Sequence, residues 1–258
     1  DIASTPFAEV RLTISPDGRT ALWFSRNRPG GPGDYDIWMS RRTEHGWAPA
    51  AQVAFNSSGR DFDPAYSPDG AFVYFSSDRS GDLGGDDLYR VAVIAAGFGV
   101  VEHLGPAVNS ASDEFAPMLS PDRKQLLFSS DRPGGAGGHD LYTAQHRSER
   151  FETAQRLRGD INTAAHEFDA VFLADSATLV FARAEDFGAA RVDLFAGAIR
   201  EGRYDAALPM SINDAAGDTY GPMLDWSSPD RLTFSARRST ARDMDLYIVR
   251  YQLPARAP

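Results

Sequence analysis

Acidic residues recur at one position of this 258-residue chain. At intervals of 52 or 53 residues the sequence places Glu9, Asp61, Glu114 and Glu167. Thr219 takes the next such position, and Asp218 lies beside it. Carboxylates that are brought together raise one another's pKa, bind a cation such as Ca²⁺, or exchange protons with a substrate. Any of these chemistries requires a fold that gathers residues this far apart in sequence.

A second column of residues follows two positions later. Its members are Arg11, Asp63, Ala116, Asp169 and Gly221. If each pair lies on one β-strand, its two side chains point to the same face. The two columns together then surround one channel mouth with as many as six carboxylates and one arginine. His166 is next to Glu167 and adds a side chain that titrates near neutral pH.

Two interpretations of these columns stay open. In the first, the carboxylates cap backbone N–H groups at the strand starts and stay solvated. In the second, they form a ligand site at the channel mouth, and the candidate residues are Glu9, Arg11, Asp61, Asp63, Glu114, His166, Glu167, Asp169 and Asp218. A divalent cation, with Ca²⁺ as the first candidate, would be held by Asp61, Glu114 and Glu167. The sequence contains no other cofactor fingerprint and assigns no catalytic residue; if the protein is an enzyme, the candidates for an acid and base pair are Asp63, Glu114, Glu167 and Asp169.

The elements that position these columns follow from an internal repeat. An aspartate followed by an apolar and an aromatic residue recurs at Asp36, Asp87, Asp140, Asp193 and Asp245, at spacings of 51, 53, 53 and 52. Ahead of it lie a Ser-Pro-Asp-Gly type turn, as at 67–70, and an alternating apolar run that ends in an aromatic residue and serine, as at 74–76. Turn residues between alternating runs predict short antiparallel strands. A glycine-rich loop precedes each aspartate, whose carboxylate we expect to accept backbone N–H bonds from that loop.

Each unit therefore predicts a four-stranded antiparallel meander. One such meander cannot cover both of its faces, so successive copies must stack, and radial stacking gives a β-propeller. Five copies predict an all-β, five-bladed β-propeller that occupies residues 1–258 as a single domain. The approximate units are 5–55, 56–108, 109–161, 162–212 and 213–253. The last unit lacks an obvious fourth strand, and we expect the N-terminal segment Asp1–Ser4 to join the C-terminal segment and complete it.

Composition narrows the function classes. The formal net charge of −10 opposes binding to nucleic acid, and no apolar run is long enough to insert into a membrane. The absence of cysteine excludes disulfides and thiolate metal sites. Phosphate-binding glycine motifs do not occur, and the segment from His166 to Ala170 lacks the second histidine of a zincin motif. We expect a monomer.

The repeat resembles the WD40-like PD40 repeat family, the TolB-like β-propellers. The second unit has almost every element of this pattern, from the segment that starts at Asp61 through Ser67-Pro68-Asp69-Gly70 to Asp87-Leu88-Tyr89. The resemblance covers essentially the whole chain and implies a propeller with a protein-binding role in the bacterial envelope. It implies a periplasmic or secreted protein, although the given chain starts without a signal peptide. The additional N-terminal domain of TolB has no counterpart in this sequence.

Three functions follow as hypotheses. The first is a non-catalytic binding propeller that recognises a protein, a peptide or a small ligand at the channel mouth. The second is a glycoside hydrolase-like enzyme, which needs two channel-mouth carboxylates about 5–10 Å apart beside an open cleft. A channel that is filled by side chains argues against this enzyme. The third is a propeller that holds a divalent cation. The sequence favours the first hypothesis and an absence of catalysis.

Overall fold

The computed structural model describes residues 7–148, 150–238 and 244–253, and these form five antiparallel sheets. The first sheet contains β1 (Glu9–Ile14), β2 (Thr20–Arg26), β3 (Tyr35–Thr43), β4 (Gly46–Trp47) and β5 (Ala51–Gln52). The second contains β6 (Asp61–Tyr66), β7 (Phe72–Ser77), β8 (Asp87–Ile94) and β9 (Gly97–His103). The third contains β10 (Glu114–Leu119), β11 (Gln125–Ser130), β12 (Asp140–Arg147), β13 (Arg150–Phe151) and β14 (Gln155–Arg156). The fourth contains β15 (His166–Phe172), β16 (Thr178–Ala184), β17 (Asp193–Arg200), β18 (Arg203–Tyr204) and β19 (Leu208–Pro209). The fifth contains β20 (Thr219–Leu224), β21 (Arg231–Ala236) and β22 (Asp245–Arg250).

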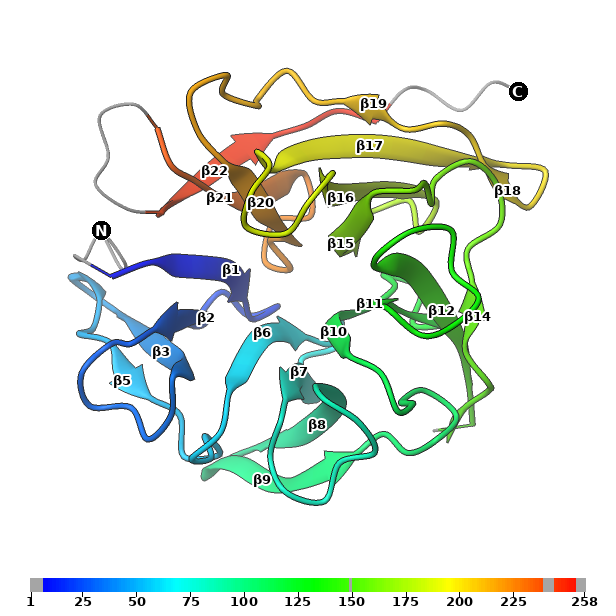
Figure 1. Cartoon of the computed structure of the whole chain (residues 1–258). Coiled ribbons are helices and arrows are strands. Elements are labelled where there is room, and N and C mark those ends of the chain that lie inside the picture. The colour runs from blue at the N-terminus through cyan, green and yellow to red at the C-terminus, as the bar shows by residue number, and fades with distance from the viewer. Residues whose placement is uncertain (1–6, 149, 239–243, 254–258) are drawn as a thin grey trace.

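The five sheets are the blades of a β-propeller, which confirms the predicted fold class. Figure 1 shows them around one axis, with β1, β6, β10, β15 and β20 innermost. Each inner strand contacts the inner strands of both neighbouring blades, and β20 of the fifth blade contacts β1 of the first. The ring is therefore continuous around the axis. No helix in the described part of the chain could cross a membrane.

Local turn chemistry forms the blades as the repeat predicts. The Ser15 hydroxyl donates to the Asp17 carboxylate at 2.6 Å and accepts the backbone N–H of Thr20 at 2.9 Å. Gly18 completes this turn at a φ of 68°, a conformation that glycine adopts without steric cost. The hydrogen bond from the Ser15 hydroxyl lowers the pKa of Asp17, so the turn is held together by an ionised carboxylate. The turn fixes the register of β1 against β2 by local contacts alone.

The glycine-rich loops meet the repeated aspartates as expected. The carboxylate of Asp140 accepts the backbone N–H of Ala136 at 2.7 Å, and Asp36 accepts that of Gly33 at 3.2 Å. A Cβ atom on Gly135 would come within 2.0 Å of the Asp140 carboxylate, so this position has room only for glycine. These aspartates hold the loop at the start of the third strand of a blade, which is a structural role.

Every inner strand contains a β-bulge at the second column of the sequence pattern. The residues in the left-handed region are Arg11 (φ 54°), Asp63 (φ 53°), Ala116 (φ 58°), Asp169 (φ 52°) and Gly221 (φ 62°). The strand register shifts at the same places, for example between Val10 and Thr13. A bulge reorients the side chain that follows it, and a non-glycine residue in this region costs about 1 kcal/mol or more. The same left-handed position is therefore present in all five blades at the axis, and it is strained in the first four, since Gly221 adopts it in the fifth without steric cost.

The fifth blade has three strands among the described residues. The predicted completion of this blade by residues 1–4 lies outside them. Contacts across the closure are noncovalent: the Thr233 hydroxyl donates to the Leu12 carbonyl at 2.7 Å, and the Glu9 N–H donates to the Met244 carbonyl at 3.4 Å. The first and last blades are thus joined by strand-to-strand contacts at the inner end.

Candidate functional site

The first acidic column lies buried at the starts of the inner strands, and each carboxylate has an arginine partner. The pairs are Glu9 with Arg28 at 3.9 Å, Asp61 with Arg79 at 2.5 Å, Glu114 with Arg132 at 2.9 Å and Glu167 with Arg183 at 2.7 Å. All four acidic residues are fully buried. Each arginine that pairs with one of the last three also stacks over aromatic rings of its own blade, as Arg132 does over Tyr142 at 4.8 Å. Every carboxylate in the column therefore already has a positive partner.

Glu114 illustrates what these carboxylates do. Its two oxygens accept the backbone N–H and the hydroxyl of Ser110, both at 2.7 Å, and the hydroxyl of Ser130 at 2.6 Å. These bonds anchor the segment that enters the inner strand. The geometry supports the capping interpretation of the column. Nothing in it requires a cation at Asp61, Glu114 and Glu167.

Glu114→Gln should lower the free energy of unfolding by about 1–3 kcal/mol, because the charge-assisted bonds to Arg132 and Ser130 weaken in a buried place. Urea denaturation measures this change. Glu102→Gln is the matched control: Glu102 pairs with Arg90 at 2.8 Å but is half exposed, so its loss should cost less than about 1 kcal/mol. Equal losses in both variants would contradict a structural role for the buried column.

The second column brings three charged residues of three blades together at the axis. Arg11 Nη1 lies 3.3 Å from Asp169 Oδ1, and Arg11 Nε lies 3.7 Å from Asp63 Oδ1. Arg11 is fully buried and also contacts Met223 Sδ at 3.2 Å through Nη2. The other oxygen of Asp169 accepts the backbone N–H of Gly221 at 3.2 Å. We call Arg11, Asp63 and Asp169 the axial triad.

The two carboxyl groups of the axial triad have different surroundings, and these act on the pKa of each. Burial and the nearby charge of Asp169 raise the pKa of Asp63 well above its ordinary value, although Arg11 opposes this. Burial also raises the pKa of Asp169, but the Arg11 guanidinium and the Gly221 N–H favour its ionised form. Burial therefore favours a proton shared by this pair, and Arg11, which lies 3.3 Å from Asp169 and 3.7 Å from Asp63, favours the ionised form of the group that it pairs with.

Arg11 fills the channel at the level of the triad. Only 4% of the Asp63 side chain and 7% of the Asp169 side chain are exposed. Met223, which contacts Nη2 of Arg11, is fully buried as well. Buried side chains therefore fill the channel at the level of the triad, and a filled channel argues against a hydrolase that works in an open channel mouth.

Residues of the first, fourth and fifth blades surround a cavity of about 770 Å³. Its floor is formed by Val10, Phe168 and Tyr220, each of which directly precedes a residue of the second column. Its walls include Phe24, Tyr35 and Phe187. The rings pack on one another: Phe168 lies 4.7 Å from Phe187, and Phe24 lies 5.6 Å from Tyr35 between centroids. We call this cavity the aromatic pocket.

Polar groups at the rim and floor of the aromatic pocket can orient a bound ligand by hydrogen bonds. Asp218 and Arg237 line it and pair with each other at 2.6 Å. Burial raises the pKa of Tyr220, so its hydroxyl stays protonated and able to donate. Aromatic faces with a few polar groups are typical of small-molecule sites.

The structure distributes the sequence-predicted residues over three places. Glu9, Asp61, Glu114 and Glu167 lie in the arginine-paired column. Arg11, Asp63 and Asp169 form the axial triad. Asp218 lies at the rim of the aromatic pocket. His166 packs on Phe187 of the pocket wall, with 4.6 Å between ring centroids, and its Nδ1 lies 2.9 Å from Nδ1 of His139.

Sequence reasoning missed the aromatic residues that precede the second column, of which Phe168 and Tyr220 line the pocket. Phe62, Phe115, Phe168 and Tyr220 each precede a residue of the second column, so a third periodic column was present in the sequence. It also missed Phe187, which belongs to the loop of the fourth unit that departs from the glycine-rich pattern. Two of the arginines that pair with the acidic column lie in the Ser-Asp-Arg segments at 77–79 and 130–132, but the sequence does not show which carboxylate each arginine contacts.

Comparison with known proteins gives structural relatives only. No protein-family model matches the chain, and no curated protein matches it in sequence. An endo-arabinase from Bacteroides thetaiotaomicron is similar over 98% of this chain and 96% of its own, with 12% identity and a TM-score of 0.64. An alpha-L-arabinofuranosidase from Lactobacillus brevis is similar over 96% and 92%, with 10% identity and a TM-score of 0.61. An alpha-L-arabinofuranosidase from Podospora anserina is similar over 96% and 91%, with 10% identity and a TM-score of 0.55.

These relatives correct the predicted function. The expectation of a non-catalytic binding propeller is wrong, because the structures that match over nearly the full length of both chains are glycoside hydrolases. The alternative hypothesis of a glycoside hydrolase-like propeller fits them better. At this low identity the likeness establishes the shared fold. The resemblance to the PD40 repeat family and the envelope location stay predictions.

Proposed function

We propose that this protein is a glycoside hydrolase-like enzyme that binds its substrate in the aromatic pocket and uses the carboxyl pair of the axial triad. The observation that supports it most is the geometry of two buried carboxyl groups, Asp63 and Asp169, on the single guanidinium of Arg11, where burial raises the pKa of both. Glycosidases need one carboxylic acid that keeps its proton and one carboxylate that stays ionised. We assign these two roles to the groups of the triad, of which Asp169 directly follows Phe168 of the pocket lining.

The roles follow from the environment of each group. Asp63 holds the proton and donates it to the oxygen of the leaving group as the glycosidic bond breaks. Asp169 stays ionised through Arg11 and the Gly221 N–H, and acts on the developing positive charge of the sugar or on an attacking water. Neither carboxyl group lines the aromatic pocket; Phe168 and Tyr220 do, and they directly precede Asp169 and Gly221, so the proposal requires the substrate to reach the pair past these two rings. The structural relatives suggest arabinofuranosides as the first substrate class to test.

Turnover of linear arabinan and of 4-nitrophenyl α-L-arabinofuranoside tests the proposal directly. We expect the folded protein to release sugar or nitrophenol from one of them. Absence of turnover above the uncatalysed rate on both substrates, with the fold verified by circular dichroism, would overturn the proposal.

Phe187→Ala should raise KM about 5–30-fold and leave kcat within about twofold, since the variant removes roughly 1–2 kcal/mol of apolar contact from the pocket wall. Phe187 is 44% exposed, so the fold should tolerate the change. Leu83→Ala is the matched control, because Leu83 is 47% exposed on the corresponding loop of the second blade and is not part of the pocket lining. An unchanged KM in Phe187→Ala would place substrate binding outside the aromatic pocket.

A further inference from the structure

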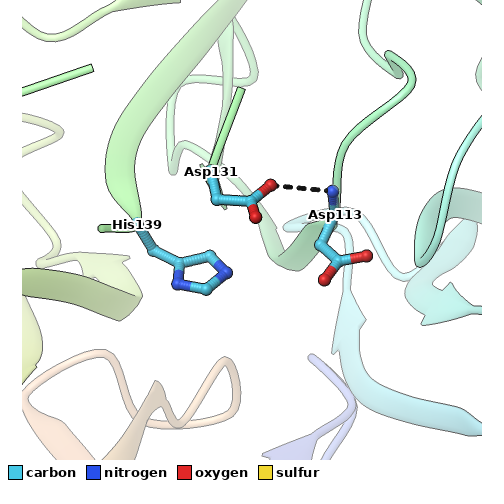
Figure 2. A group of neighbouring side chains, drawn as sticks. All are labelled: Asp113, Asp131 and His139. Carbon is cyan, nitrogen blue, oxygen red and sulfur yellow. Dashed lines mark hydrogen bonds between the residues drawn. The ribbon is translucent and has the colours of Figure 1, made fainter. Parts of the chain in front are cut away.

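A group of potential metal ligands lies on the third blade, apart from the axial triad. Asp113 precedes β10, Asp131 follows β11 and His139 precedes β12. One candidate ligand atom from each lies within 4.8 Å of those from the other two. Figure 2 shows a ring nitrogen of His139 and both carboxylates directed toward a common space, with the Asp113 N–H donating to Asp131 Oδ1 at 3.0 Å. Three separate segments of the blade therefore present oxygen and nitrogen donors to one point.

The hydrogen bonds of His166 fix the tautomer of His139. The backbone N–H of His139 donates to His166 Nδ1 at 3.3 Å, so this nitrogen carries a lone pair. Nδ1 of His139 lies 2.9 Å from the same atom and must supply the proton between them. Nε2 of His139 is then the nitrogen that remains for the carboxylate side. A metal-bound histidine typically donates its other ring N–H to such a neighbour, which orients the ring.

Comparison of the repeats shows that the third blade lacks a positive charge at this place. The corresponding residues of the second blade are Arg60, Asp78 and Asp86. Arg60 precedes Asp61 as Asp113 precedes Glu114, Asp78 precedes Arg79 as Asp131 precedes Arg132, and Asp86 precedes Asp87 as His139 precedes Asp140. There the Arg60 guanidinium lies 3.0 Å from Asp78 and 2.9 Å from Asp86. In the fifth blade the corresponding pair is Asp218 with Arg237, at 2.6 Å.

In the third blade, Asp113 replaces the arginine of this arrangement. No lysine or arginine nitrogen of the described residues lies within 4.0 Å of the Asp113 or Asp131 carboxylate. Two carboxylates therefore face a histidine nitrogen without an arginine of their own blade, although Asp113 interacts with the charge of Arg60 of the second blade and its Oδ1 accepts the Asp86 N–H at 3.0 Å. A bound cation stabilises two carboxylates in this arrangement.

We propose that Asp113, Asp131 and His139 bind one divalent transition-metal ion, with Zn²⁺ as the best fit. Imidazole nitrogen favours Zn²⁺ over Ca²⁺ or Mg²⁺, and a histidine with two carboxylates and one water completes a four-coordinate site. Ligand atoms around Zn²⁺ are about 3.3–3.5 Å apart, given bonds of about 2.0–2.2 Å. The side chain of Asp131 is exposed and can close this difference by rotation. The ion replaces the Arg60 guanidinium of the second blade.

The site borders the aromatic pocket without being part of its lining. The His139 ring lies 5.0 Å from Phe187 and 5.0 Å from Phe115 between centroids. A bound ion would hold the His139 ring, and with it the outer face of Phe187, in place. The metal proposal stands on the third blade alone and does not depend on hydrolysis of a glycoside.

Isothermal titration of EDTA-treated, dialysed full-length protein with ZnCl₂ tests the site, with CaCl₂ as the comparison ion. We expect one Zn²⁺ per chain and tighter binding of Zn²⁺ than of Ca²⁺. Asp131→Asn keeps the Oδ1 acceptor for the Asp113 N–H and removes the negative charge, so the affinity should fall at least about tenfold. Asp113→Arg recreates the second-blade arrangement and should abolish binding.

Asp82→Asn is the matched control. It removes a carboxylate from the glycine-rich loop of the second blade, and the variant should bind Zn²⁺ like the wild type. The absence of saturable one-to-one binding would overturn the proposal. Equal affinities of the wild type and Asp131→Asn would also overturn it, since the ion would then bind elsewhere. Tighter binding of Ca²⁺ than of Zn²⁺ would contradict the role of His139.

Discussion

Asp63→Asn should lower kcat for glycoside hydrolysis about 10²–10⁴-fold while the protein stays folded. Asp63 is the group of the axial triad that holds a proton, because burial and the charge of Asp169 raise its pKa. Asparagine has the shape of the protonated acid but cannot transfer a proton. It also tolerates the left-handed backbone of this position, where φ is 53°. The free energy of unfolding near pH 7 should therefore change by less than about 1 kcal/mol.

The pH dependence of the reaction provides the second readout for Asp63. Wild-type kcat/KM should fall at high pH as Asp63 loses its proton, and at low pH as Asp169 gains one. Asp63→Asn should remove the high-pH limb from the residual activity. Asp34→Asn, an exposed carboxylate on the glycine-rich loop of the first blade, is the control and should match the wild type. Full activity in Asp63→Asn would exclude Asp63 as the proton donor.

Arg11→Met should lower the free energy of unfolding by about 3–5 kcal/mol at pH 8, because two carboxyl groups are left in a buried place without their guanidinium. The loss should shrink as the pH falls. Without Arg11 the folded-state pKa values of Asp63 and Asp169 rise further above those of the unfolded chain, so the folded state binds more protons and stability declines as the pH increases. Urea denaturation at pH 5 and pH 8 measures both effects.

The combined variant Arg11→Met, Asp63→Asn, Asp169→Asn is the control for this interpretation. It removes all three charges together, so no unpaired charge stays buried, and most of the lost stability should return with little dependence on pH. A loss below about 1 kcal/mol in Arg11→Met that is the same at both pH values would show that the triad does not hold the blades together.

The sequence was sufficient for the propeller because the signals for each blade are local. The turn around Ser15 and Asp17 is closed by bonds between residues at most five positions apart. The Asp140 carboxylate reaches the loop only four residues before it. Each unit of the repeat contains its own turn and loop contacts, so counting units counts blades.

The sequence did not separate structural from candidate functional carboxylates. Both acidic columns have the same period, and Glu114 looks as available for chemistry as Asp63. What distinguishes them is the partner: Glu114 has Arg132 of its own blade at 2.9 Å, whereas Asp63 shares Arg11 of another blade with Asp169. The repeat pattern describes one blade at a time and contains no information on pairs between blades.

The sequence by itself therefore determined the five-bladed fold and the two columns that face the axis. Only the tertiary structure decided which members of those columns meet. Arg11 and Asp169 are 158 residues apart and bond because the ring places the first and fourth blades opposite one another across the channel. Charge balance in each place, an arginine beside Glu114 and none beside Asp113, depends on side chains that the fold brings in from elsewhere. Propensity and turn chemistry act over a few residues, whereas burial, pKa and metal-ligand geometry arise from contacts that exist only once the ring has closed.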